Sequence, residues 1–311
     1  MFNYKGLSEE QILALCKEDN VDRGKSTWKY WASEVYSFGK HYRNYGFYPE
    51  KKPLLVYSEH AVDNPNVGLN EIENDANAML VFSKEKYDKY KKIPNKPCYI
   101  ITNPMVWYRK SNNIAQTGNA IGTLAFPVHS TPKTETIFDI KSYITDLKKM
   151  PENMQPVCVC LHMHDINNGQ YKIFLDNNIP VYTAGNAYDI KFAQRFYNIL
   201  KNFKFACSNT IGSYAYYSVE MGIPFSLFGK TPKYINIDDP NLSEGEYKIE
   251  EMDYYIKFCN LFNGIHTSIT KEQQEHVMNR CCSPYGISRL KLFQILWTSY
   301  LKYKISKIFK Q

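Results

Sequence analysis

The sequence lacks any apolar run of the ~18–20 residues that a membrane-spanning helix requires. Its first residues, MFNYKGLSEEQ, also lack the apolar core of a secretory signal peptide. It contains no internal repeat and no low-complexity tract, which argues against a solenoid or a linker-type protein. We therefore expect a cytoplasmic protein, either free in the cytosol or peripheral on the inner face of the cytoplasmic membrane.

Paired C-x-x-C spacing is absent, which argues against a structural zinc site. Several of the eight cysteines lie within apolar stretches, where a reduced thiol packs as a small hydrophobe. We therefore expect no disulfide framework. The cysteines are Cys16, Cys98, Cys158, Cys160, Cys207, Cys259, Cys281 and Cys282.

One alternating run carries potential metal ligands, namely Cys158, Cys160, His162 and His164, and Asp165 follows it. On one strand these four side chains would face the same side, with neighbours ~6.6 Å apart. That spacing is too wide for all four to bind one tetrahedral ion, although His162 and His164 stay open as a pair. We expect no metal and interpret the run as a buried strand that ends at a ligand site.

Signatures of P-loop enzymes and of nucleic-acid binding are also missing. Gly24-Lys25-Ser26 is similar to the end of a P-loop, but Asp19 stands where the first glycine belongs and no strand precedes it. No RNA- or DNA-recognition motif is present, and the basic residues do not form one continuous stripe. We expect no nucleic-acid partner.

Positive charge gathers near the C-terminus of this chain, whose net charge is +7. Between Arg289 and Lys310 there are six basic residues and no acidic one, and leucine, isoleucine and aromatic residues lie among them. The pattern predicts an amphipathic helix over 286–311. Such a helix either lies on an anionic membrane surface or packs on the core and shows its lysines to water.

Length and hydropathy predict an α/β fold with two Rossmann-like domains that face a cleft. A chain of 311 residues suits two domains of ~100–200 residues each, and 44% hydrophobic residues can fill both cores. Short apolar runs alternate with helical segments, which is typical of parallel sheets. The polar segment 110–120 is a candidate hinge, so we predict an N-terminal α/β domain over 1–112, a C-terminal Rossmann-like domain over 113–285 and the helix over 286–311.

The predicted elements cover most of the chain. Helices are expected at 8–17, with Ser8 as the cap, and at 26–44. Strands are expected at 54–61, 78–83, 98–102, 122–127, 157–163, 180–185, 203–208 and 223–229. Further helices are expected at 84–93, 138–150, 167–177, 189–202 and 211–221.

Polar residues follow the predicted strands at the end where open α/β sheets bind ligands. They include Glu59, His60, His129, Ser130, Thr131, His162, His164, Asp165, Gly185, Asn186, Ser208 and Asn209. The most specific segment is CSNTIGSYAYYSVEMGIPFSLFG, residues 207–229. If Ser208 and Asn209 open its helix, free N–H groups there can hold a phosphate that Gly212 allows to come close. Plain capping by Ser208 or Asn209 is the alternative.

The order strand, S-N-x-x-G-S-Y, helix, E-M-G-I-P, strand resembles the donor-binding half of GT-B glycosyltransferases. The resemblance is to members associated with bacterial capsule and lipopolysaccharide. Residues 28–43, 56–61 and 122–131 are also similar and follow the same order, although His60-Ala61 stands where the group has His-Gly.

The resemblance implies that the C-terminal half binds a CMP- or UDP-linked sugar and that the N-terminal half binds a glycan or glycolipid acceptor. Glu59 or His60 would be the catalytic base, and no metal or cofactor would be needed. The implied donor-binding residues are His129, Ser130, Thr131, Gly185, Asn186, Ser208, Asn209, Gly212, Ser213 and Glu220.

The function predicted is therefore sugar transfer from a nucleotide-sugar donor to a growing surface glycan, in capsule or lipopolysaccharide. Two alternatives stay open. One is a nucleotide-sugar epimerase or polyol-phosphate transferase on a related scaffold. The other is a non-catalytic subunit of a polysaccharide assembly complex.

Overall fold

The structure is a computed structural model that describes residues 2–93 and 96–308. The chain forms two compact units that interleave along the sequence. Unit 1 comprises Met1–Val21, Asn113–Ala187 and Gln194–Glu275. Unit 2 comprises Asp22–Asn112, Tyr188–Ala193 and His276–Gln311.

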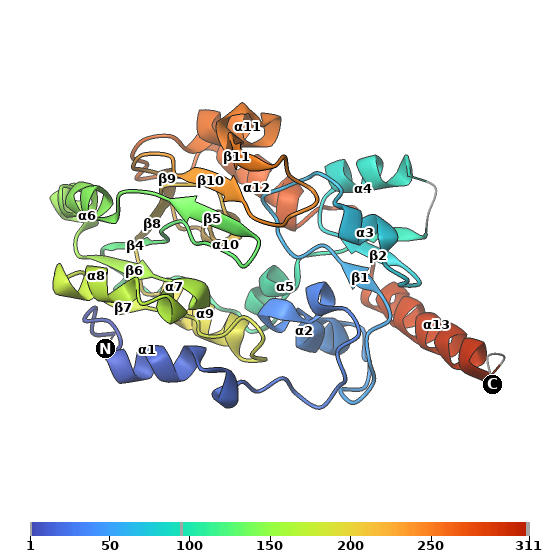
Figure 1. Ribbon diagram of the computed structural model, residues 1–311. Helices are drawn as coiled ribbons and strands as arrows, with labels where there is room; N and C mark the ends of the chain where they lie inside the picture. The colour runs from blue at the N-terminus through green and yellow to red at the C-terminus, as the bar shows by residue number, and fades with distance from the viewer. Residues whose placement is uncertain (1, 94–95, 309–311) are drawn as a thin grey trace. The chain divides into compact units, whose positions relative to one another are not determined.

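Unit 1 contains a five-stranded parallel sheet in the order β7-β6-β4-β8-β9 (Figure 1). Its strands are β4 (Thr123–Ala125), β6 (Val157–Cys160), β7 (Val181–Tyr182), β8 (Phe205–Ser208) and β9 (Phe225–Leu227). Every residue of these strands is buried, as expected for a parallel sheet covered on both faces. The order is that of a doubly wound sheet, which confirms the predicted Rossmann-like fold for this unit.

Helices connect the strands of unit 1. They are α6 (Ile140–Lys148), α7 (Met163–Asn167), α8 (Tyr171–Asp176), α9 (Phe192–Leu200) and α10 (Ser213–Glu220), and α11 (Asp253–Phe262) follows later. The helix predicted over 167–177 corresponds to α8, and the short helix α7 precedes it. The strand predicted over 157–163 ends at Cys160, since His162 already caps α7.

The N-terminal residues belong to unit 1. Helix α1 (Glu9–Cys16) begins at the predicted cap, where Ser8 and Gln11 form a reciprocal capping box. It buries Ile12 and Cys16, and the Leu7 N–H donates to the Val181 carbonyl of β7 (2.8 Å). These contacts join residues 1–21 to the later part of the chain, whereas the boundary predicted at 112 treats each domain as continuous.

A second sheet of unit 1 has no counterpart in the sequence prediction. It is antiparallel, with the order β11-β10-β5, and its strands are β5 (Thr134–Ile137), β10 (Lys233–Asn236) and β11 (Gly245–Tyr247). All three strands are largely polar and partly exposed, so no apolar run marks them.

Unit 2 contains a three-stranded parallel sheet in the order β1-β2-β3, as the strand–helix alternation predicts. Its strands are β1 (Tyr57–Ser58), β2 (Met79–Val81) and β3 (Cys98–Ile100). A cluster around Tyr57, Met79, Val81, Tyr90 and Ile100 fills the core. The helices are α2 (Phe38–Tyr45), α3 (Leu69–Glu73), α4 (Lys84–Lys91), α5 (Pro104–Ser111) and α13 (Arg289–Ile308), and α12 (Lys271–Cys281) leads into the unit. The parallel sheets and the C-terminal helix are thus confirmed, while the cleft between domains stays a prediction.

The helix predicted over 26–44 is wrong for its first half. Residues 31–33 and 35–37 form single 3₁₀ turns, and α2 begins only at Phe38. Tyr36 (φ 57°) and Ser37 (φ 63°) both lie in the left-handed region, which interrupts any continuous α-helix.

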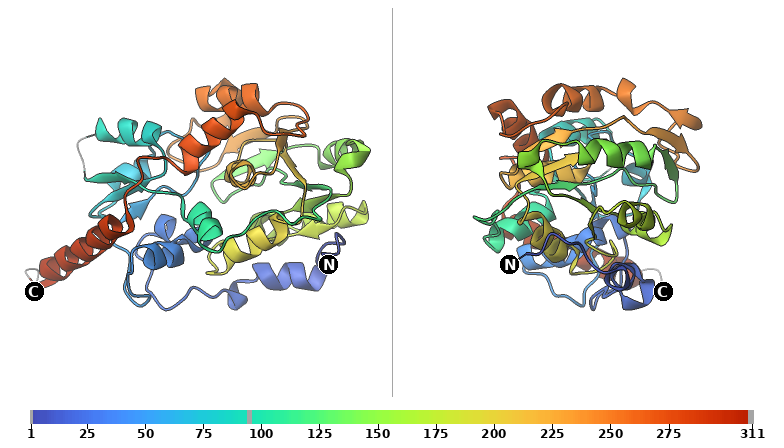
Figure 2. Two further views of the ribbon diagram at one scale, coloured as in Figure 1. Left: turned by 180° about the vertical axis from the view of Figure 1, so that it is seen from behind. Right: turned by 90° about the vertical axis from the view of Figure 1, so that its left-hand side faces the viewer.

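Helix α13 extends away from the β1–β3 sheet (Figure 1 and Figure 2). Within residues 2–93 and 96–308, no helix combines the length and apolarity needed to cross a bilayer.

Candidate functional site

The candidate site lies at the carboxyl edge of the unit 1 sheet. The chain runs from β4 to β6 and β7 on one side and then returns to β8 on the other side of β4. This reversal makes the space beyond β4 and β8 the topological switch point, where open α/β sheets bind their ligands. The residues that follow β4, β6 and β8 therefore define the site.

Three histidines gather at this edge. His129 follows β4, His162 follows β6 and caps α7, and His164 lies in the first turn of α7. The rings of His129 and His162 are stacked, with centroids 4.2 Å apart and an interplanar angle of 17°. The ring of His164 lies 4.9 Å from that of His162. His129 and His164 are half-buried, so each retains an accessible part.

In the histidine cluster (His129, His162 and His164), burial favours the neutral rings of His162 and His164. Burial lowers the pKa of His162 well below its usual range, and the positive charge that His129 and His164 would carry lowers it further. Burial also lowers the pKa of His164. A bound anion would act in the opposite direction, because negative charge stabilises the imidazolium form.

Asp165 follows His164 in α7 and is 1% exposed. Burial raises the pKa of its carboxyl group to about 7. The backbone N–H groups of His162 and Ser130 oppose this shift, yet among the described residues neither carboxyl oxygen accepts a hydrogen bond of normal geometry. A buried carboxyl group without good partners, one residue after His164, marks Asp165 as a candidate functional residue.

Asn209 connects the two strands at the switch point. Its side-chain oxygen accepts a hydrogen bond from the Val128 N–H (2.9 Å), which ties the loop after β8 to the loop after β4. Its amide nitrogen is buried and has no hydrogen-bond partner among the described residues. The Asn209 side-chain oxygen therefore has a structural role, and its amide nitrogen is available to donate a hydrogen bond to a ligand.

Ser208 does not open the helix as predicted. It is the last residue of β8, it is fully buried, and its hydroxyl group bonds to the Tyr214 hydroxyl (2.8 Å) and the Thr210 N–H (3.1 Å). Helix α10 begins later, at Ser213, with Gly212 as an N-cap that provides no side-chain hydrogen bond. A Cβ at Gly212 would lie 2.5 Å from the Tyr214 ring, so the glycine makes room for that ring.

Ser130 and Thr131 build the turn from β4 into β5. The Ser130 hydroxyl accepts from the Thr136 N–H (3.0 Å), and the Thr131 hydroxyl accepts from the N–H groups of Lys133 and Thr134. The His129 ring approaches the Ser130 carbonyl (3.1 Å). These residues thus shape the loop that carries His129.

Gly185 and Asn186 hold the N-terminal segment. Gly185 has φ +84° and lies against Leu15 and Arg195, and the Asn186 amide group donates to the Cys16 carbonyl and the Glu18 carboxylate. Glu220 lies at the opposite end of α10, ~10 Å along the axis from Ser213. These three predicted donor contacts are therefore not part of the histidine cluster.

The four potential metal ligands do not share one strand. Cys158 and Cys160 lie in β6, whereas His162 and His164 belong to the start of α7. Across the described part of the chain, no group of three or more His, Cys, Asp or Glu side chains is arranged to hold a metal ion.

In unit 2, Glu59 lies in a buried ion network. It is 1% exposed, it accepts a hydrogen bond from the Phe82 N–H (2.7 Å), and Lys86 Nζ lies 3.6 Å from one of its oxygens. Lys86 also pairs with Glu71 (2.7 Å). Burial raises the pKa of Glu59 to about 7, although Lys86 and Arg280 oppose the shift.

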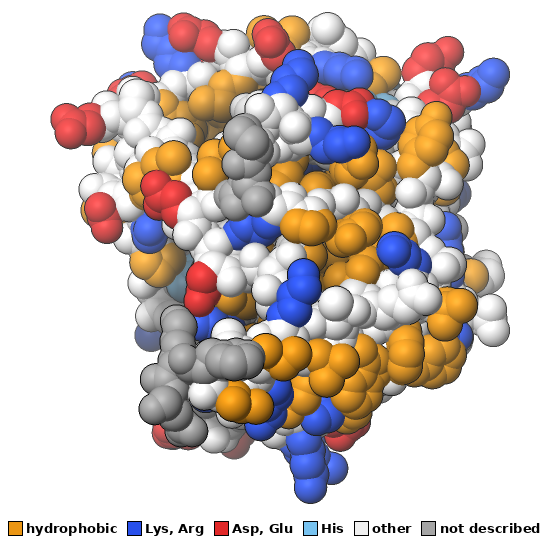
Figure 3. Space-filling view, turned by 90° about the vertical axis from the view of Figure 1, so that its right-hand side faces the viewer, with side chains coloured by type: hydrophobic (Ala, Val, Ile, Leu, Met, Phe, Trp, Pro, Cys, Tyr) orange, Lys and Arg blue, Asp and Glu red, His pale blue; other side chains and the backbone are white. Residues whose placement is uncertain are grey.

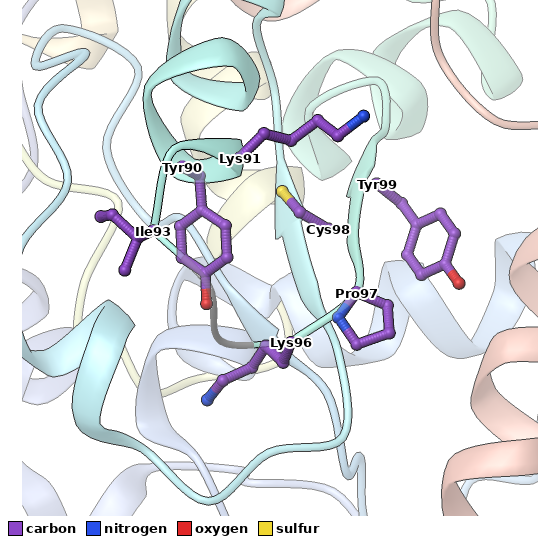
Figure 4. A pocket seen from close by; sticks show the side chains of 7 residues that line it. All are labelled: Tyr90, Lys91, Ile93, Lys96, Pro97, Cys98 and Tyr99. Carbon is purple, nitrogen blue, oxygen red and sulfur yellow. The ribbon is translucent and has the colours of Figure 1, made fainter.

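His60, directly after Glu59, is half-buried and packs its ring against Trp31, with centroids 4.7 Å apart. Unit 2 also contains a cavity of about 470 Å³, lined by Tyr90, Lys91, Ile93, Lys96, Pro97, Cys98 and Tyr99 (Figure 4). This cavity lies at the amino end of β3, and no predicted site residue lines it.

No protein-family model matches the sequence, and no curated protein matches it. Among solved structures, the chain is similar to the wall teichoic acid polymerase TagF, with 13% identity over 97% of this chain and 94% of the other, and a TM-score of 0.45. It is also similar to the glycosylation associate protein (Gap123) complex from Streptococcus agalactiae, with 14% identity over 96% of this chain and a TM-score of 0.35. In that case it spans about half, 54%, of the other chain. Likeness of this degree does not decide an activity.

The structure brings one predicted donor-binding residue, His129, together with His162 and His164, which are outside the predicted set, and Asp165 follows them in α7. The sequence does contain a signal for them, because the predicted strand over 157–163 includes His162, and His164 and Asp165 follow it directly. The strand prediction conceals the role of His162, which caps α7 in the structure.

Proposed function

We propose that the histidine cluster binds the phosphate groups of a nucleotide-sugar donor and that the protein is a glycosyltransferase. The observation that carries the proposal is the stack of His129 on His162 at the carboxyl edge of β4 and β6, beside the switch point. Nucleotides bind at this place in doubly wound folds. The sequence resemblance of residues 122–131 and 207–229 to donor-binding segments supports the same class.

The cluster would contribute to catalysis through charge. In sugar transfer, the acceptor oxygen forms a bond to the anomeric carbon, and the bond from that carbon to the donor phosphate breaks. The phosphate oxygen leaves with the electron pair, so negative charge grows there. Imidazolium groups at His129 and His164 would stabilise this charge, and they are accessible enough to touch it. The unpartnered amide of Asn209 is a further donor at the same edge.

The acceptor hydroxyl group must lose its proton to a base. Of the two residues implied by the resemblance, Glu59 is engaged with Lys86 and the Phe82 N–H, whereas His60 is half-buried. This difference favours His60 as the base, since an imidazole suits proton transfer near neutral pH. The acceptor in this proposal is a surface glycan or glycolipid, such as capsule or lipopolysaccharide, extended on the cytoplasmic side.

The first experiment is nucleotide binding to the full-length protein, measured by thermal shift and calorimetry with CMP, CDP, UMP, UDP, GDP and ADP. A ligand at ~100 times its dissociation constant adds ~2.7 kcal/mol of stability, so a responder is easily seen. His129→Gln should weaken its binding about tenfold, the scale of one charge-assisted hydrogen bond. His266→Gln is the matched control, because His266 is also half-buried in unit 1 but lies after β9.

The outcomes distinguish the remaining functions. Equal loss of affinity in His129→Gln and His266→Gln would mean that the histidine cluster is not the nucleotide-binding site. A bound donor that is cleaved without any acceptor would point to an epimerase, and a CDP-polyol as the productive donor would point to polyol-phosphate transfer. If no nucleotide binds to a well-folded sample, the non-catalytic alternative takes the place of this proposal.

A further inference from the structure

Helix α13 has two apolar faces on opposite sides. Its inner face is formed by Leu292, Ile295, Leu296 and Ser299, which are all buried. Its outer face is formed by Leu290, Leu301, Ile305 and Ile308, which are 66%, 55%, 52% and 70% exposed. Successive residues of a helix turn by ~100°, which places these two sets roughly 180° apart. A surface helix needs only the inner face to pack, so the outer face requires an explanation of its own.

Up to Tyr300, contacts with other residues of unit 2 hold the helix. The Asn77 amide donates to the Ser299 carbonyl (3.1 Å), and the Tyr48 and Trp297 rings pack edge to face at 5.4 Å. Lys52 lies over the Tyr300 ring (3.9 Å). Beyond Tyr300 the helix continues for more than two turns, and of residues 301–308 only Tyr303 is half-buried. These last turns, with Leu301, Ile305 and Ile308, are presented to the surroundings.

The charged residues of α13 itself have a single sign. Helix α13 contains Arg289, Lys291, Lys302, Lys304 and Lys307 and no acidic residue. At 100° per residue, Lys302 and Lys304 flank the apolar strip of Leu301, Ile305 and Ile308 on its two sides. Figure 3, which looks at the side where α13 ends, shows hydrophobic side chains in a band near its lower edge with lysine and arginine side chains beside them.

We propose that the outer face of α13 docks on an anionic membrane surface. Leu301, Ile305 and Ile308 would enter the boundary between headgroups and acyl chains, while Lys302, Lys304 and Lys307 contact lipid phosphates. An apolar strip between lysines is the arrangement of interfacial helices, which lie in the membrane plane without crossing it. This inference goes beyond the proposed glycosyltransferase activity and does not depend on it.

A second copy of the chain fits this face less well. Pairing two outer faces would bury the same apolar strips, but it would bring the lysines of both helices together with no acid to compensate. Like charges facing each other across an interface are repulsive, whereas anionic lipid is complementary to every charged residue of this helix. The charge pattern therefore selects the membrane.

The test is flotation of the full-length protein with phosphatidylcholine vesicles that either contain or lack phosphatidylglycerol, at low and high salt. Binding should require the anionic lipid and weaken as salt screens it. Lys302→Gln/Lys304→Gln/Lys307→Gln should reduce it about a hundredfold, because each lysine near an anionic surface contributes roughly a factor of five. The control Lys141→Gln/Lys148→Gln/Lys149→Gln removes the same charge from exposed lysines on or next to α6 and should leave binding within about twofold.

Leu301→Ser/Ile305→Ser tests the apolar part and should also release the protein, with circular dichroism to verify that the fold is intact. Binding that is equal for neutral and anionic vesicles, or equal for the two triple-lysine variants, overturns the proposal. So does a failure of the wild type to bind at low salt. If sedimentation instead shows a dimer that Leu301→Ser/Ile305→Ser dissociates, the outer face belongs to a second copy.

Discussion

Asp165 combines near-complete burial with poorly satisfied oxygens, and this combination makes stability depend on pH. Its pKa is raised to about 7 in the folded protein by burial, whereas an unfolded chain releases the proton near ~3.9. Because the folded state keeps the proton over this window, it loses stability as pH rises through it. The Asp165→Asn variant carries no charge at this position, so its unfolding free energy should not fall for this reason. Relative to the wild type, the unfolding free energy of the variant should therefore increase by about 2–3 kcal/mol between about pH 5 and 8.

Urea unfolding at several pH values measures this difference. Asp176→Asn, at an exposed position of the neighbouring helix α8, is the control and should run parallel to the wild type. If the Asp165→Asn curve is also parallel, the carboxyl group is ionised throughout and has partners that satisfy it.

Gly185 is a second residue whose role the structure changes. Its φ of +84° disfavours any other residue, and an added Cβ would lie 2.7 Å from Arg195 Nη1 and 2.8 Å from the Leu15 carbonyl oxygen. Gly169 has a similar φ of +75° but nothing within 4 Å of an added Cβ. Gly169→Ala should therefore cost about 1 kcal/mol from the backbone alone, and Gly185→Ala about 2–4 kcal/mol because overpacking adds to it. Equal unfolding midpoints in urea would mean that the N-terminal segment can move away from Gly185.

Single residues at strand ends could be predicted from sequence only as candidates. His129 follows a short apolar run, which marks it as a candidate, and the structure joins it to His162. The same rule marks Ser208, but its hydroxyl group is bonded to that of Tyr214, which lies six residues later. No periodicity in the sequence reveals that the Tyr214 side chain packs against the end of the strand. Which polar residue at a strand end stays available to a ligand therefore depends on tertiary packing.

At the scale of elements, prediction worked where burial leaves a continuous apolar run. The parallel strands β4, β6, β8 and β9 all lie within predicted strands, because both faces of each are covered. The antiparallel strand β5 alternates between buried and exposed residues and consists of Thr-Glu-Thr-Ile, which no apolar pattern distinguishes from a loop. The predicted helix over 26–44 was wrong at its start because positive φ at two ordinary residues is a tertiary effect.

The sequence leaves two environments open for the C-terminal helix, namely packing on the core and lying on a membrane surface. The inner face of α13 is buried as the first requires, and its outer face is exposed as the second requires. Leu296 is 2% exposed and Leu301 is 55% exposed in the same helix. Leu296→Ala should lower the free energy of unfolding by about 2–4 kcal/mol through a cavity, whereas Leu301→Ala should change it by less than about 0.5 kcal/mol. Chemical denaturation of both variants measures this. A large cost at Leu301 would show that the last turns pack on the protein after all.

At the scale of the whole molecule, each unit is built from three separate segments of the chain, so a single cut in the chain does not separate the two units. Residues 1–21 belong to unit 1, where the Leu7 N–H bonds to the Val181 carbonyl, and the rings of Phe2 and Tyr182 stack at 5.2 Å. Strand β7 is the edge of its sheet, and an edge that loses its cover exposes unpaired backbone groups. The stability of β7 should therefore depend on a segment that lies more than 150 residues earlier.

Deleting residues 2–21 should remove amide-exchange protection from β7 (Val181–Tyr182) and from the adjacent β6 (Val157–Cys160), because opening of an edge strand spreads to its neighbour. Protection of β1, β2 and β3 in unit 2 should stay within experimental error, since none of their pairings involves the deleted residues. Hydrogen exchange read by mass spectrometry resolves these peptides. Deletion of residues 301–311 serves as the control and should leave β7 unchanged. Equal deprotection of both sheets would mean that unit 1 and unit 2 unfold as one cooperative body, and the division into units would then describe geometry without describing stability.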